Sequence, residues 1–198
     1  NATDLIFYTG HSEAAAEKIR FTSQNEIGIG GANYGTDGQI LTSAGAGAAV
    51  AWEDAGTNTP AFGVYMSGNV YATSDTWTRV AWDSEYFDTD SAFASGKFTV
   101  PSNKGGKYVF TAGGLIENLA DGKFAEIGLY KNGSLTSNRQ RSTRFVSVAG
   151  GDGYINKTWI DVAVATDYFE VYVFNGDDDD HYFENGSQYF FGYKLIGV

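Results

Sequence analysis

Apolar and polar residues alternate in short runs over most of the chain after residue 60, and a period of two is typical of half-buried β-strands. Residues 98–100 form one such run, and Pro101, which has no backbone N–H to donate, is expected to end it. Gly105 and Gly106 favour a turn, and residues 108–112 alternate again with aromatic side chains on one side. We predict a hairpin between these two strands with an aromatic inner face.

Further runs of the same character bring the total to about nine or ten strands, which is typical of a β-sandwich or jelly roll. The sequence therefore predicts an all-β fold. Asn132-Gly133, which follows one of the runs, suits the type I′ turn of a tight hairpin. The further runs are residues 61–66, 77–82, 125–130, 144–148, 158–164, 168–174 and 189–196.

The first 60 residues carry shorter patterns. Residues 1–31 hold three strand-like pieces, and residues 13–18 suffice for one helical turn that is too short to stand alone. So small a segment needs a partner, and the same segment on other chains is the expected one. Residues 32–60 are rich in Gly and Ala and predict a connector. We thus divide the chain into a β-rich shaft segment (1–31), a connector (32–60) and a jelly-roll head (61–198).

Composition and charge narrow the possible functions. The chain has no Cys, which excludes disulfides, thiol catalysis and Cys-based metal sites. Its 24 acidic and 13 basic residues give a net charge of −11, opposite in sign to a surface that binds nucleic acid. No apolar run approaches the roughly 20 residues of a membrane-spanning helix. We therefore expect no nucleic-acid partner and no membrane insertion.

Two phrases in the N-terminal part occur in tandem. Residues 4–31 read DLIFYTG, a spacer, and then EKIRFTSQNEIGIGG, and residues 35–52 begin with GTDGQILTS and end with Trp52. Both phrases resemble a repeat and connector of bacteriophage tail-fibre and related structural proteins, with Asn25-Glu26 departing from the usual pattern. The resemblance implies a virion appendage on the outside of the particle, joined to other virion proteins through the N-terminal segment.

A second resemblance covers residues 61–198. The pattern around 98–110, the turn at 129–133, Asp167 and the closing strand at 191–195 are similar to the globular head of complement component one-q. That superfamily shares the tumour-necrosis-factor jelly roll, so the resemblance implies ten strands in two sheets and a tight homotrimer. It also implies that the first and last strands lie side by side near the trimer axis. The implied trimer interface consists of Tyr189, Phe191, Tyr193 and Leu195.

The sequence departs from the family pattern at one turn. Thr166 precedes Asp167 where the family usually has Gly, so this turn is expected to differ in conformation. The closing strand at 189–196 is apolar or aromatic almost throughout, which agrees with burial on both faces.

The basic cluster of the head is a candidate receptor site. Arg139, Arg141 and Arg144 lie close together in an acidic chain, and guanidinium groups bind phosphates and carboxylates with two parallel hydrogen bonds. These residues would then bind an anionic glycan or the phosphates of lipopolysaccharide. Two alternatives remain open: the arginines pair with acidic residues across subunits, or their charge protects an edge strand from aggregation.

An acidic run is a candidate metal site. Asp177, Asp178 and Asp179 supply oxygen ligands of the kind that Ca²⁺ prefers. The alternative is a solvated hairpin loop, because adjacent side chains cannot all point at one ion. No other cofactor is expected.

No set of residues in the sequence matches the pattern of a known catalytic site. Acid pairs such as Asp83/Glu85 and Asp88/Asp90 are present, but none stands out from the others as a glycosidase dyad. We therefore expect no enzyme activity, and a fibre or spike whose trimeric head attaches to a host surface by multivalent binding. The alternatives are a capsid-decorating or baseplate protein without a ligand, and a depolymerase of surface polysaccharide.

Overall fold

The computed structural model describes residues 3–56, 58–136 and 142–196, and within these ranges the chain forms strands and turns but no helix. Accordingly, no helix in the described part has the length and hydropathy to cross a membrane. The chain divides into two compact units, Asn1–Thr57 and Asn58–Val198.

The first unit contains two small antiparallel sheets. One has the order β1-β2-β3 and the other pairs β4 with β5. Leu5, Phe7 and Phe21 remain exposed, so the described residues of this unit enclose no apolar core within one chain. The single helical turn that residues 13–18 could have formed is absent, because Glu17 is part of β2 and pairs with Tyr8 of β1. The strands are β1 Leu5–Thr9, β2 Ala16–Phe21, β3 Ile27–Ile29, β4 Gln39–Thr42 and β5 Ala51–Asp54.

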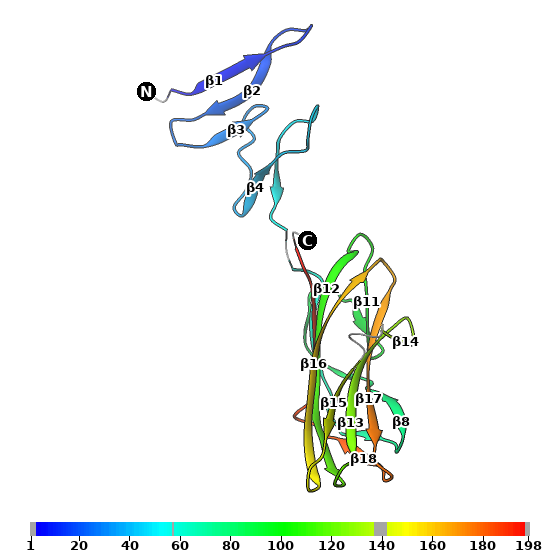
Figure 1. The fold of residues 1–198 in the computed structure, drawn as a ribbon. Coiled ribbons are helices and arrows are strands. Elements are labelled where there is room, and N and C mark those ends of the chain that lie inside the picture. Colours follow the sequence, from blue (N-terminus) through cyan, green and yellow to red (C-terminus); the bar gives the residue numbers. More distant parts are fainter. Residues whose placement is uncertain (1–2, 57, 137–141, 197–198) are drawn as a thin grey trace. The chain divides into compact units, whose positions relative to one another are not determined.

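The second unit, which we call the head, is an all-β sandwich of two sheets (Figure 1). One sheet has six strands in the order β10-β11-β17-β13-β14, with β15 also paired to β13. The strands of this sheet are β10 Phe93–Ala94, β11 Lys97–Thr99, β13 Phe124–Lys131, β14 Ser134–Leu135, β15 Ser142–Val146 and β17 Tyr168–Gly176. The strand β8 Thr76–Arg79 runs beside β17, where the N–H of Val80 donates to the carbonyl of Val171 over 2.9 Å.

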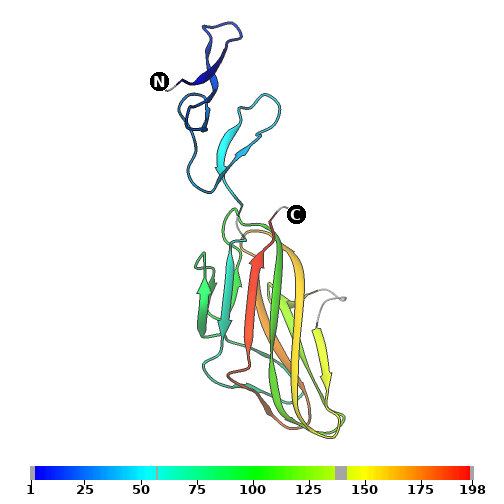
Figure 2. The same ribbon diagram turned by 90° about the vertical axis from the view of Figure 1, so that its left-hand side faces the viewer.

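The other sheet has seven strands in the order β7-β18-β12-β19-β6-β9, with β16 also paired to β12. Figure 2 views this sheet so that β16, β12, β19 and β6 lie next to one another. The closing strand therefore pairs with the first strand of the head, as the resemblance implies. The strands are β6 Ala61–Tyr65, β7 Val70–Ala72, β9 Ser84–Asp88, β12 Gly106–Leu119, β16 Gly151–Ala163, β18 His181–Phe183 and β19 Tyr189–Lys194.

The predicted hairpin between residues 98–100 and 108–112 is wrong. Phe98 lies in the six-stranded sheet, where it pairs with Phe169, whereas Tyr108 lies in the seven-stranded sheet, where it pairs with Asp161 and Lys194. The chain crosses from one sheet to the other at Pro101 and the residues that follow. Alternation of apolar and polar residues only requires that the aromatic rings of both strands point into the core. Two strands that face each other across the core meet this requirement as well as two strands paired in one sheet.

The core between the sheets is aromatic. The ring of Phe62 lies 4.8 Å from that of Phe98 and 4.9 Å from that of Phe190, and Phe110 lies 4.4 Å from Phe169. These five side chains are at most 1% exposed. Because such large side chains contribute most of the apolar surface removed from water, they connect the two sheets into one folding unit.

Two turns can be compared with their sequence signals. Asn132 and Gly133 have φ values of 52° and 77°, and positive φ at both central residues is the mark of the predicted type I′ turn. Thr166 has a φ of 76° and so adopts the left-handed conformation that Gly would adopt more easily. This turn therefore holds a β-branched residue in a conformation that L-residues rarely adopt, and whether it differs from the turn of the family stays a prediction.

Candidate functional site

The outer face of the seven-stranded sheet presents a continuous set of mostly apolar side chains, which we call the apolar face, and the charged Lys107 lies on the same side of the sheet opposite Val162. Register places Thr158, Thr111, Phe191, Gly63 and Phe87 in one row across five strands. Because side chains two residues apart share a side of a sheet, neighbouring rows extend the same surface. The apolar face consists of Tyr65, Tyr86, Phe87, Val109, Thr111, Tyr154, Thr158, Ile160, Val162, Val164, Tyr189, Phe191 and Tyr193.

A bulge in the edge strand concentrates aromatic rings on the apolar face. The register of β6 and β9 shifts between Gly63 and Val64, so that Tyr86 joins Phe87 on the outer side. The ring of Tyr86 stacks on Phe191 with 5.9 Å between centroids. A Cβ on Gly63 would lie 2.5 Å from the ring of Phe191, so a larger residue would displace that ring. Gly63 therefore allows the aromatic side chains to lie directly on the backbone.

The predicted trimer residues lie together at the centre of the apolar face. Tyr189, Phe191 and Tyr193 point outward from β19, and Leu195 follows at the same parity just beyond the strand. Phe190 points into the core, whereas Tyr193 is 40% exposed. Within one chain the closing strand is thus buried on its inner side and partly exposed on its outer side. The assignment of these residues to a trimer interface stays a prediction.

The sequence reasoning missed the part of the apolar face that β16 supplies. Ile160, Val162 and Val164 point outward, while Trp159 and Ala163 on the alternate positions are buried in the core. A strand with apolar residues on both of its sides is typically buried on both faces of the sheet. This pattern was present in the sequence.

Of the three arginines predicted to bind a receptor, the structure places Arg144, while Arg139 and Arg141 lie outside the described residues. Arg144 lies in β15, and its Nε donates to Glu126 Oε1 over 2.7 Å. Its guanidinium covers the ring of Phe124 with 3.8 Å to the centroid. The positive charge is therefore matched within the chain, on the outer face of the six-stranded sheet. A shallow hollow of about 200 Å³ beside it is bordered by Trp77 and Phe174. Anion binding at Arg144 stays a prediction.

The acidic run forms a loop whose carboxylates point to different partners. Asp177 is 3% exposed and accepts hydrogen bonds from the N–H groups of Ala120 and Asp178, both over 2.7 Å. The carboxylate of Asp178 forms an ion pair with Lys123 over 2.7 Å. The carboxylate of the following Asp180 accepts from the N–H of Ser74 over 2.8 Å.

Hydrogen bonding lowers the pKa of one carboxylate of the loop. Burial raises the pKa of Asp177, but the hydrogen bonds from Ala120, His181 and Asp178 more than compensate, so its pKa lies below the usual range. His181 Nε2 lies 3.1 Å from Asp177 Oδ2. In the described ranges no group of three His, Cys, Asp or Glu residues could hold a metal ion. The arrangement of Asp177, Asp178 and Asp179 gives a hydrogen-bonded loop, and the calcium site stays a prediction without a ligand set.

Comparison with known proteins adds evidence on the fold. No protein-family model and no curated protein matches the sequence. Among solved structures, the head is similar to the globular domain of zebrafish complement 1qA, with a TM-score of 0.48 and 17% identity over 70% of this chain and 98% of that one. It is also similar to Eiger TNF from S. frugiperda, with a TM-score of 0.51 and 15% identity over 70% of this chain and 93% of that one. The head thus has a jelly-roll fold of the tumour-necrosis-factor type, and at these identities the similarity extends to the fold alone.

Proposed function

We propose that the chain is a structural binding protein whose head assembles as a homotrimer and attaches an appendage to a target surface. The observation that carries the proposal is the apolar face. Soluble monomers rarely expose a large contiguous apolar surface, and such a surface marks an interaction site. Here it lies on one sheet of a chain whose net charge of −11 would otherwise keep copies apart.

The proposal gives the closing strand a specific role. Tyr189, Phe191, Tyr193 and Leu195 would contact the same strand of two other copies around a three-fold axis. Cyclic assembly closes the interface and leaves no apolar surface free to form filaments. Three copies of any weak site on the head would then act together, and their joint affinity can exceed that of one site by about 10²–10⁴-fold.

The parent particle is part of the same proposal. The phrases at 4–31 and 35–52 support a bacteriophage-type fibre or spike, located on the outside of the virion. The exposed Leu5, Phe7 and Phe21 would be covered when the first unit packs against other copies or other virion proteins. The target is proposed to be a host cell-surface glycan or protein.

Assembly is tested by charging the closing strand. We expect Phe191→Asp to convert the trimer to monomers in multi-angle light scattering, because trimerisation would bury an unpaired carboxylate. Val148→Asp is the matched control: Val148 is 85% exposed and does not belong to the apolar face. A native chain that is monomeric, or a Phe191→Asp variant that stays trimeric with an unchanged far-UV circular dichroism spectrum, would contradict the proposal.

Attachment is tested with isolated host envelopes. The native trimer should bind to them more tightly than the Phe191→Asp monomer by at least about tenfold, since multivalency is lost in the monomer. Equal binding by both forms would contradict multivalent attachment. Release of shortened glycans by the native chain would instead support the depolymerase alternative, and a stable trimer that does not bind would support a purely structural role.

A further inference from the structure

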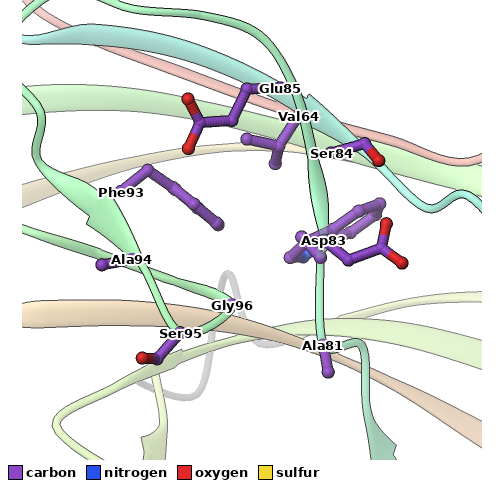
Figure 3. A pocket seen from close by; sticks show the side chains of 10 residues that line it. Val64, Ala81, Asp83, Ser84, Glu85, Phe93, Ala94, Ser95 and Gly96 are labelled. Carbon is purple, nitrogen blue, oxygen red and sulfur yellow. The ribbon is translucent and has the colours of Figure 1, made fainter.

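A cavity of about 410 Å³ lies at one open side of the sandwich (Figure 3). One wall is the segment from Ala81 to Glu85, which leads into the edge strand β9 of the seven-stranded sheet. The opposite wall is the hairpin of β10 and β11, at the edge of the six-stranded sheet. Val64 and Trp82 lie at the wall nearer to the core. The cavity therefore opens where the two sheets separate, and its volume suits a ligand of sugar size.

Hydrogen bonds and an ion pair hold the hairpin wall in place. Arg79 donates from its guanidinium to the carbonyl of Ser95, and its Nε forms an ion pair with Glu170 over 2.7 Å. Glu170 is 8% exposed, whereas the Arg79 side chain is 34% exposed, so this pair is only partly shielded from water. The N–H of Phe93 donates to Asp88 over 2.7 Å and fixes the other end of the hairpin. The cavity is thus formed by a preorganised wall rather than by a free loop.

The carboxylates of Asp83 and Glu85 lie beside the cavity and differ in whether they are free to bind a ligand. Asp83 accepts hydrogen bonds from the N–H of Ser67 over 2.8 Å and from its hydroxyl over 2.7 Å, and these bonds lower its pKa. Figure 3 shows that the Asp83 side chain extends away from the hairpin, whereas the Glu85 carboxylate extends toward the hairpin that carries Phe93. Within the described residues no group pairs with the Glu85 carboxylate. Glu85 is therefore the anion that a ligand would meet.

Aromatic groups complete the site. Phe93 presents its ring from the hairpin wall, and aromatic faces attract cations through their quadrupole. The same recognition occurs elsewhere in the head, where Lys97 Nζ lies 4.4 Å from the centroid of the Tyr168 ring. Trp82 is 4% exposed, and its indole N–H has no hydrogen-bond partner among the described residues. A buried donor without a partner is unusual, and an acceptor oxygen on a ligand would satisfy it.

We propose that this cavity binds a small organic amine that also carries hydroxyl groups, such as an amino sugar. The ammonium group pairs with Glu85 beside the ring of Phe93, and a hydroxyl oxygen accepts from the Trp82 indole. A neutral sugar lacks the charge for Glu85, and an anion would be repelled by it. The inference rests on the proposed attachment function for its biological role, since the site would supply the head with a specific ligand.

Binding can be measured by isothermal titration calorimetry on the full chain, with glucosamine as the probe and N-acetylglucosamine as the neutral sugar of matched ring. We expect saturable binding of glucosamine and at least about tenfold weaker binding of N-acetylglucosamine. Glu85→Gln should weaken glucosamine binding by at least about tenfold. Trp82→Phe, which keeps an aromatic ring but removes the N–H, should weaken it by about threefold to tenfold.

Glu53→Gln is the control variant, because it makes the same charge change in the first unit and should leave binding unaltered. Absence of saturation at millimolar glucosamine, equal affinity for both sugars, or an unaffected Glu85→Gln variant would each overturn the inference. Light scattering on the same samples keeps the two proposals separate. A trimer that fails to bind glucosamine contradicts the amine site alone, and a monomer that binds it contradicts the trimer alone.

Discussion

The outer faces of the two sheets of the head differ in what covers them. On the six-stranded sheet, Trp77 from β8 packs against Phe174 with 5.4 Å between ring centroids, and Arg144 lies over Phe124 and pairs with Glu126. On the seven-stranded sheet, the rings of the apolar face pack against one another and stay partly exposed, namely Tyr65, Tyr86, Phe191 and Tyr189.

The two outer faces therefore have different roles, one in the stability of the subunit and the other in the proposed assembly. The face that is closed by elements of its own chain contributes to the stability of each subunit. The face that remains apolar and open should contribute little until another surface covers it, and we propose that this surface is another copy. Substitutions on the two faces should therefore change different measurable quantities, and the following predictions use that separation.

The largest effect is expected on the apolar face. Ile160 is 54% exposed and pairs with Val109, so Ile160→Asp should leave the unfolding of one subunit unchanged within about 0.5 kcal/mol. It should weaken trimerisation by at least about 100-fold, because a buried unpaired charge costs about 3–5 kcal/mol. Analytical ultracentrifugation over a concentration series measures the association. An unchanged association constant would remove Ile160 from the interface.

The second effect is expected on the outer face of the six-stranded sheet, where a substitution should lower subunit stability and leave association unchanged. Trp77→Ala removes ring contacts with Phe174 and Tyr130 and should lower the free energy of unfolding by about 3 kcal/mol. Association of the subunits should remain as in the native chain. Denaturant unfolding gives the stability, and loss of association in a folded Trp77→Ala variant would show that the two faces are not separable.

An intermediate effect is expected from the core that both faces share. Burial raises the pKa of Tyr108 to about 12, and the charge of Asp90 contributes to the rise. Because this value exceeds that of an unfolded Tyr, the stabilisation is complete below about pH 10 and is lost as pH rises toward 12, which amounts to about 2–3 kcal/mol. Stability measured between pH 9 and 12 should fall less steeply in Tyr108→Phe. Parallel curves for the two proteins would contradict this assignment.

The smallest effect is expected at a turn outside both faces. Thr166 is β-branched and has a φ of 76°, so Thr166→Gly should stabilise the head by about 0.5–1 kcal/mol. The gain is partly offset because Gly increases the freedom of the unfolded chain. A rise in the melting temperature with unchanged association is the expected result, and a fall would indicate that the Thr166 side chain makes a stabilising contact.

Sequence reasoning predicted local features better than pairings. The alternating runs gave the all-β class, and Asn132-Gly133 gave the turn type, because both depend on residues adjacent in sequence. The partner of Phe98 was predicted wrongly, since alternation defines which side of a strand is apolar but not which strand lies beside it. The ion pair between Arg144 and Glu126 and the bulge at Tyr86 depend on register between separate strands, which no local pattern specifies.

The position of β19 has a consequence for how the head folds. This strand comes after all the others of the head in sequence, yet it lies in the interior of its sheet between β12 and β6. The backbone groups of β6 that face β19 have no partner until that last segment arrives, and the contact joins positions separated by nearly the whole unit. Long-range pairing of this kind is slow, so folding intermediates should carry an open slot where a neighbouring chain's final strand can insert.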